Sequence, residues 1–271
     1  MSGIAYFFCC LGLLIAGYAV YGVIAEKVFG VDRSRPTPVM SKADGMDYVP
    51  MPTWKLTLIQ FLNIAGLGPV FGPIVGALYG PAALLWVVFG CIFAGAVHDF
   101  FSGMMSLRYG GASYPEIISR NLGEGVRKFI VIACGAISGF HATQSPMMAR
   151  CMTNEAQGRK VFYGSMICEG IVGLVWVTLG LSFYDSAQAL FGPGPNAVPA
   201  AVIVKNISVS LLGTFGGILA ILGVVALPVS TGDTAFRSCR MMLADAFHLD
   251  QGPIKNRILL ALPVFVIGIA L

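Results

Sequence analysis

Long apolar stretches separated by short polar connections dominate the pattern along the chain. The hydrophobic segments cover residues 4–25, 56–79, 82–107, 129–145, 161–183 and 207–229, and another apolar run begins near residue 258. A helix that crosses a bilayer needs roughly 20 apolar residues, and in lipid it must satisfy its own backbone hydrogen bonds. The pattern therefore predicts an all-α polytopic membrane protein with about seven hydrophobic segments.

The polar stretches set the expected domain organisation. Residues 26–55 and 108–128 are polar connections. Residues 233–257 alternate apolar side chains with Arg237, Arg240 and Asp245, which predicts an interfacial helix and a connection. Residues 1–271 are then a single transmembrane domain, and we expect it to be C-terminally incomplete because the last apolar run holds only about 14 residues.

Composition excludes a water-soluble protein. The chain is 56% hydrophobic and 11% charged, whereas a soluble domain carries about a quarter charged residues. The net charge of +4 is spread over the connections and forms no basic run with aromatic residues, so no nucleic-acid partner is expected. The cysteines and histidines show no metal-ligand spacing, and neither HExxH nor GxSxG is present, so we expect no metal, no cofactor and no enzyme activity.

The second segment contains a cluster of helix-breaking residues. Residues 65–73 (AGLGPVFGP) hold three glycines and two prolines, which cannot continue a straight helix. Broken spans at membrane depth line the substrate sites of secondary transporters, although a packing kink would leave the same pattern. The resulting substrate-binding candidates are Gly66, Gly68, Pro69, Gly72 and Pro73.

A second discontinuity is expected around residues 139–146 (GFHATQSP). If every segment crossed the membrane, the basic residues would divide ten to seven between the two sides. If the fourth segment instead returns to its own side, the division becomes sixteen to one, which the positive-inside rule favours. The substrate-binding candidates here are His141, Thr143 and Gln144.

Ionisable groups at membrane depth are the candidates for a coupling ion, because they are costly there unless paired or neutralised. We rank Asp233 first, since hydroxyl side chains surround it directly after a span, although it could simply cap the next helix. His98 and Asp99 could equally fix a helix end. The full set comprises His98, Asp99, Glu169, Ser230, Thr231, Asp233 and Thr234.

Five motifs in order along the chain resemble the carbon starvation protein A (CstA) family. They are residues 44–50 (DGMDYVP), the break at 65–73, 95–100 (GAVHDF), 231–237 (TGDTAFR) and 244–247 (ADAF). The resemblance implies an inner-membrane uptake system for peptides or, in some branches, pyruvate with proton coupling, used in response to carbon starvation. It also implies an inverted-repeat fold with discontinuous helices, of which this chain resembles the N-terminal portion.

One departure from the family pattern limits what can be carried over. The longer branch has paired histidines just before the break, where this chain has Gln60, Phe61, Leu62 and Asn63. A proton role of that histidine pair therefore cannot be assigned to this chain.

The expected function is a secondary active transporter of small organic nutrients, with a small-molecule substrate, a proton or other cation, and the lipid bilayer as partners. A missing C-terminal half or an oligomeric partner would complete its site. The alternatives are a channel-like protein or a non-transporting membrane scaffold.

Overall fold

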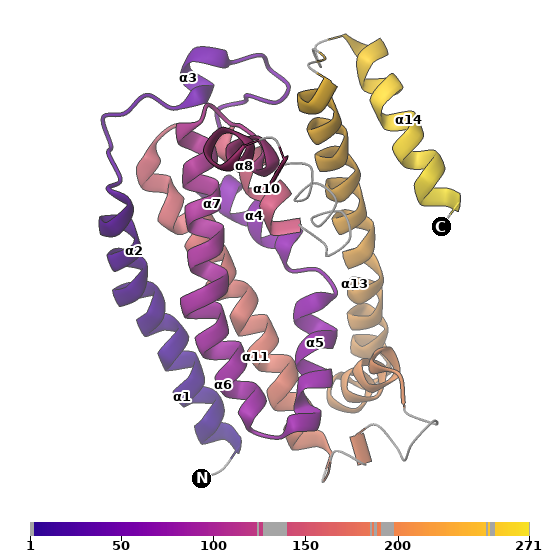
Figure 1. Cartoon of the computed structure of the whole chain (residues 1–271). Helices are drawn as coiled ribbons and strands as arrows, with labels where there is room; N and C mark the ends of the chain where they lie inside the picture. Colours follow the sequence, from indigo (N-terminus) through magenta and orange to yellow (C-terminus); the bar gives the residue numbers. More distant parts are fainter. Residues whose placement is uncertain are drawn as a thin grey trace.

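The computed structural model describes residues 3–123, 125–126, 140–184, 186, 189–190, 198–247, 249 and 253–270. Apart from one isolated bridge between Met51 and Met152, the regular structure of these residues is helical. Their helices long and apolar enough to cross a membrane are Ile4–Phe29, Ala82–Arg108, Glu155–Phe183 and Ala200–Met241, and a bent pair adds a further candidate. The predicted all-α polytopic membrane fold is confirmed (Figure 1).

Three of these spans contain a π-helical turn between or beside α-helices. The first consists of α1 (Gly3–Ala16), η1 (Gly17–Tyr21) and α2 (Gly22–Phe29). The second consists of α6 (Ala82–Phe89), η3 (Gly90–Gly95) and α7 (Ala96–Arg108). The third consists of the short turn η4 (Glu155–Gln157), then η5 (Arg159–Gly164) and α11 (Ser165–Phe183). A π turn interrupts the regular hydrogen-bond ladder, so its carbonyl groups can accept bonds from neighbouring helices.

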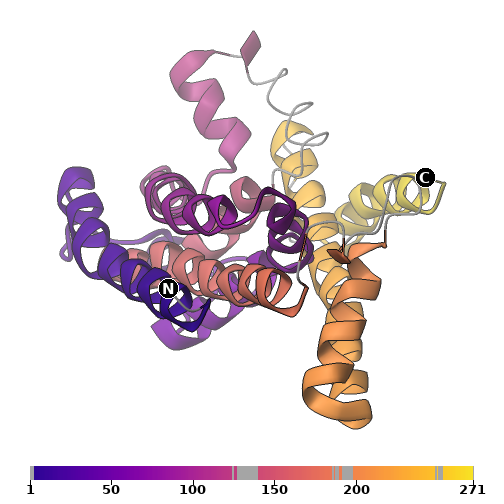
Figure 2. The same ribbon diagram turned by 90° about the horizontal axis from the view of Figure 1, so that it is seen from below.

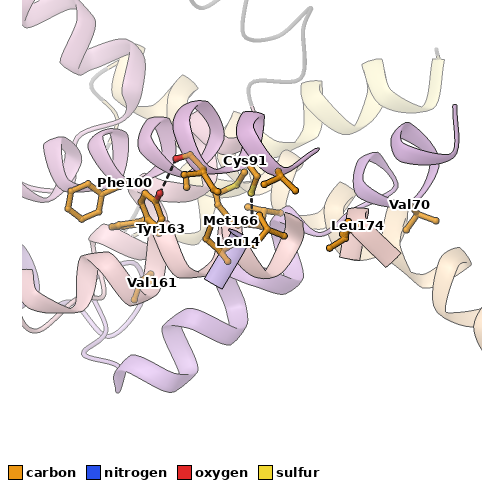
Figure 3. Packing of buried hydrophobic residues seen from close by; sticks show 14 of the residues in the cluster. Leu14, Val70, Cys91, Phe100, Val161, Tyr163, Met166 and Leu174 are labelled. Atoms are coloured by element: carbon orange, nitrogen blue, oxygen red, sulfur yellow. Dashed lines mark hydrogen bonds between the residues drawn. The ribbon is translucent and has the colours of Figure 1, made fainter. Parts of the chain in front are cut away.

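The core forms where these π turns meet (Figure 3). The Tyr163 hydroxyl donates to the carbonyl of Ile92 at 2.9 Å, and the Cys91 thiol donates to the carbonyl of Met166, also at 2.9 Å. Gly103 lies so close to the ring of Phe162 that no larger residue fits without movement. Small residues at helix contacts and hydrogen bonds across helices are how membrane helices associate.

The second hydrophobic segment is broken, as the Gly/Pro cluster predicts. Helix α4 (Thr53–Ile64) ends at the start of the cluster, and α5 (Gly68–Gly76) resumes after three residues and ends in the 3₁₀ turn η2 (Ala77–Tyr79). The two parts are bent by 51°. Pro69 lies in the first turn of α5, where its missing N–H costs nothing, whereas Pro73 lies inside the helix.

The C-terminal part of the chain differs from the sequence prediction. Helix α13 (Ala200–Phe247) continues through the region where the sequence predicted an end of the span at 229 and a new interfacial helix from 233. Its one non-helical residue is Gly213, with φ 67°, where the helix turns sharply (Figures 1 and 2). Asp233 is therefore inside a helix, so the alternative in which it caps the next helix does not hold. Helix α14 (Ile254–Ala270) packs beside α13.

The short helices α3 (Pro38–Lys42) and α8 (Tyr114–Leu122) and the end of α10 (Phe140–Ala149) lie at one end of the bundle (Figure 1), which we call the basic end for the basic residues of its connections. Glu155 follows the fourth segment and pairs with Arg35 in the connection 26–55 and with Arg108 in the connection 108–128, so it links three connections at this end. Arg150, directly after α10, donates to the carbonyl of Gly111 at 2.8 Å. The connections on both flanks of the fourth segment thus lie at the same end, as the sixteen-to-one division of basic residues predicts.

Candidate functional site

The candidate site lies beside the break between α4 and α5. Helix α10 packs against α7, α4 and α13, and α13 packs against both halves of the broken span. Polar residues from these elements are buried here, at a depth where most other side chains are apolar. Such groups are costly at membrane depth, so their retention points to a function.

Asp99 is the centre of the buried polar group. Its carboxylate is fully buried; Oδ2 accepts a hydrogen bond from the Gln60 amide at 2.9 Å, and Oδ1 accepts one from the Ser145 hydroxyl at 3.3 Å. Asp99 precedes Arg108 at the basic end by nine residues. At 1.5 Å per residue, its depth below that end is about 14 Å, near the middle of a bilayer core about 30 Å thick.

Additional hydrogen-bonding capacity surrounds this carboxylate. Gln144, next to Ser145 in α10, is fully buried, and neither atom of its side-chain amide has a partner among the described residues. The Gln60 carbonyl oxygen is likewise buried without a partner among them. Buried amides are normally satisfied, so these groups are available to a bound ion, water or substrate.

The unwound residues 65–67 face α13. A side chain at Gly66 would meet the Thr231 hydroxyl oxygen at 3.0 Å, and that oxygen is buried without a partner among the described residues. One turn further along α13, the Thr234 hydroxyl donates to the Asn63 carbonyl oxygen at 2.7 Å. The helix break and the threonines of α13 therefore form one polar surface.

Two cavities open between this surface and the basic end. The smaller, about 220 Å³, reaches from Asn63 and Thr234 to Asp47 and Arg237. The larger, about 430 Å³, shares Asp47 and Arg237 and extends between α13 and α14. A large apolar groove of about 880 Å³ lies elsewhere, between α1, α4 and α11, and holds none of the buried polar groups described here.

The loop that carries Asp47 is held by its own sequence. The Asp44 carboxylate accepts hydrogen bonds from the backbone N–H groups of Met46, Asp47 and Tyr48 at 2.8–2.9 Å. Partial burial opposes ionisation of Asp44, but these backbone bonds prevail and lower its pKa. Tyr48 anchors the loop to the Gly110 carbonyl at 3.0 Å. The carboxylate of Asp44 thereby fixes the place of Asp47 at both cavities.

Comparisons with known proteins assign the chain to a family. Residues 2–128 and 127–192 match the family described as carbon starvation protein CstA. The chain belongs to the CstA carbon starvation protein family. An uncharacterized membrane protein of Haemophilus influenzae is 31% identical over 364 aligned positions, which cover 75% of this chain and 98% of that protein. No solved structure matches the chain.

Relatives whose names state a function match a smaller part of this CstA-family chain. The peptide transporter CstA of Escherichia coli is 36% identical over 124 residues, or 45% of this chain and 18% of that transporter. The pyruvate/proton symporter BtsT of E. coli is 37% identical over 115 residues, or 42% of this chain and 16% of the symporter. The chain thus spans less than a fifth of these two transporters.

The structure divides the predicted coupling residues of this family member into separate places. Asp99 is buried in the polar group, Thr231 and Thr234 face the break, and Asp233 is exposed and lines both cavities. His98 is exposed, and its ring lies 6.0 Å from that of Tyr114. Of the two further candidates, Glu169 is half-buried within α11, and the side chain of Ser230 lies outside the described residues.

The predicted substrate residues also separate. Gly66 contacts α13 and Gln144 lies next to the Asp99 group, whereas Gly68 and Gly72 have open space beside them. Pro73 packs instead against Gly173 of α11. The predicted residues His141 and Thr143 belong to α10, and their side chains lie outside the described residues.

Sequence reasoning missed three residues that complete the polar group: Gln60, Asn63 and Ser145. Gln60 and Asn63 occupy the stretch where the longer family branch has paired histidines, and they are polar residues three apart in an apolar helix. That spacing was the available signal, since it places both near one face of α4. What the sequence could not supply is the partner of each, Asp99 for Gln60 and Thr234 for Asn63.

Proposed function

We propose that the protein is a secondary active transporter of small organic nutrients, namely peptides or pyruvate-like carboxylates, coupled to a proton or another cation. The observation that carries the proposal is the buried Gln60–Asp99–Ser145 group beside a helix broken by 51°. Discontinuous helices next to buried polar groups are how secondary transporters form substrate and ion sites. The names of the two E. coli relatives, a peptide transporter and a pyruvate/proton symporter, support the same class.

In this proposal Asp99 holds the coupling cation and the break admits the substrate. A carboxylate at mid-membrane depth is tolerated when a proton or a cation neutralises it. The amide of Gln60 and the hydroxyl of Ser145 orient the carboxylate, and the unpartnered amide of Gln144 offers donors and an acceptor to whatever binds beside it. Chemistry on the substrate has no part in this mechanism, and we propose that the protein is not an enzyme.

The charge distribution supports the proposed orientation. Contacts made by Glu155, Arg150 and Arg237 join four connections at one end of the bundle. Cytoplasmic loops carry the excess of lysine and arginine. We therefore place this end, with both small cavities, on the cytoplasmic side of the inner membrane.

Counterflow in proteoliposomes tests the proposed function. Vesicles containing the protein are loaded with unlabelled pyruvate, alanine or dialanine and then given the same labelled compound outside. A carrier accelerates labelled uptake through exchange, whereas a channel shows no such acceleration. Imposing a proton gradient and a sodium gradient separately identifies the coupling ion. If none of the compounds shows substrate-specific uptake, the transporter proposal is rejected and a membrane scaffold becomes the favoured function.

Gly66→Leu should impair transport, while the same change at Gly68 or Gly72 should be tolerated. Only Gly66 lies against another helix, with the Thr231 hydroxyl at 3.0 Å from an added Cβ; the other two have nothing within 4 Å. Overpacking costs about 1–3 kcal/mol, so uptake by Gly66→Leu should fall about tenfold if one transport conformation bears the strain. Initial uptake rates at equal protein content measure the effect. Equal rates for all three variants would reduce the break to a packing kink.

A further inference from the structure

We propose that the larger cavity between α13 and α14 is a binding site for a small organic monocarboxylate, formed by Arg237, Arg240 and Arg257. Arg237 and Arg240 lie one turn apart on α13, and Arg257 faces them from α14. The cavity holds about 430 Å³, which is ample for a carboxylate with a short side chain. In treating that carboxylate as a transported substrate, the inference rests on the function proposed above.

Unused hydrogen-bonding capacity points to a ligand. The Nε atoms of Arg240 and Arg257 are buried, and neither has a partner among the described residues. A buried guanidinium donor without an acceptor is costly, whereas a carboxylate matches its planar geometry with charge-assisted hydrogen bonds. The two arginines line the same cavity from different helices.

The charge of the lining favours a monoanion. The described residues around the cavity carry three guanidinium groups and two carboxylates, those of Asp47 and Asp233. One bound carboxylate would balance this charge. Arg237 is also only loosely engaged, because its Nη2 lies 3.7 Å from Asp47 Oδ1, beyond normal hydrogen-bond distance, and its side chain is 47% exposed. A ligand carboxylate can therefore compete with Asp47 for Arg237.

The remaining wall favours an organic anion over an inorganic one. The rings of Phe236 and Phe265 stack at 4.8 Å between centroids, and Met46 and Val264 extend the apolar surface. A cavity with convergent cationic groups on one side and an apolar wall on the other suits a carboxylate with a hydrocarbon part. Phosphate would leave that apolar wall unused.

Two motifs that carried the family resemblance meet at this cavity. Met46 and Asp47 come from residues 44–50, whose loop Asp44 holds in place. Asp233, Phe236 and Arg237 come from residues 231–237. The smaller cavity shares Asp47 and Arg237 and continues to Asn63 beside the break, so the carboxylate site lies on the path to the buried polar group.

Ligand binding to the purified chain in nanodiscs tests the inference without requiring transport. The probes are propionate and its neutral analogue propionamide, measured by saturation-transfer NMR in phosphatidylcholine nanodiscs, and inorganic phosphate, measured as a competitor of propionate. Propionate should bind and propionamide should not. Arg240→Gln and Arg257→Gln should each weaken propionate binding about tenfold, the typical effect of losing one charge-assisted hydrogen bond. Lys255→Gln, an exposed basic residue of α14 away from the cavity lining, should leave it unchanged.

Three outcomes would overturn the inference: propionate and propionamide binding equally to the unmodified protein, an unchanged propionate affinity in both arginine variants, or tighter binding of phosphate than of propionate. A lipid headgroup is distinguished by repeating the titration in phosphatidylglycerol nanodiscs. Propionate that binds in neither lipid, while phosphatidylglycerol stabilises the chain only when Arg257 is present, would reassign the site to lipid. Normal counterflow without propionate binding would reject this site and leave the proposed function standing.

Discussion

Asp99→Asn is expected to abolish concentrative uptake while leaving exchange of labelled for unlabelled substrate measurable. The asparagine side chain preserves the size of the carboxyl group and can still bond Gln60 and Ser145, so the fold should persist. It cannot take up and release a proton or neutralise a cation. Without a bound coupling ion, the ratio of substrate inside to substrate outside should fall by about 100-fold or more. The reason is that losing the interaction between a buried carboxylate and its cation costs several kcal/mol. Uptake against a gradient and counterflow, measured on the same vesicles, separate the two activities.

Asp233→Asn is the matched control for this prediction. Asp233 is exposed within α13 and lines the cavities, so its neutralisation should change substrate affinity modestly and leave coupling intact. Our proposal thereby reverses the ranking that the sequence favoured, in which Asp233 came first. Two results would make Asp233 the favoured coupling residue again. One is full accumulation by Asp99→Asn with unchanged pH dependence, and the other is loss of coupling in Asp233→Asn alone.

Glu155→Ala should destabilise the protein by about 2–3 kcal/mol, because it removes a buried carboxylate that several cations and donors share. Its side chain is 1% exposed; it accepts two hydrogen bonds from Arg108 at 3.0 Å and one from the Asp32 backbone N–H at 2.8 Å. Arg35 adds a longer contact at 3.5 Å. The loss should appear as a lower midpoint in thermal unfolding of the detergent-solubilised protein.

Glu116→Ala provides the comparison for the unfolding measurement. Glu116 pairs with Arg120 one turn away in α8, at the same end of the bundle, but both side chains are substantially exposed. Pairs of this kind contribute about 0.3–0.5 kcal/mol. A similar shift for the two variants would show that the Glu155 contacts add nothing beyond an ordinary surface ion pair.

Local physical rules made the broken span predictable. Proline cannot donate its backbone nitrogen and glycine weakens the helix, so the break at residues 65–67 follows from the residues themselves. The gathering of basic connections at one end followed from the positive-inside rule, which acts on each loop separately.

The predicted helix start at Asp233 failed because tertiary packing overrode a local signal. Residues 230–234 (STGDT) resemble a cap when they are read alone. In the structure, Thr234 bonds Asn63 and Thr231 lies against Gly66, so α13 continues past them and satisfies its own backbone. Gly213, which carried no prediction, instead takes the left-handed φ that turns the helix.

The sequence by itself determined the membrane class, the break in the second segment and the side on which the basic connections gather, because hydropathy, backbone chemistry and charge act through each residue independently. Only the tertiary structure decided which polar residues meet. Gln60, Asp99 and Ser145 come from three helices separated by dozens of residues, and Arg240 and Arg257 come from two more. No local rule specifies such contacts, since they depend on how the helices pack around one another.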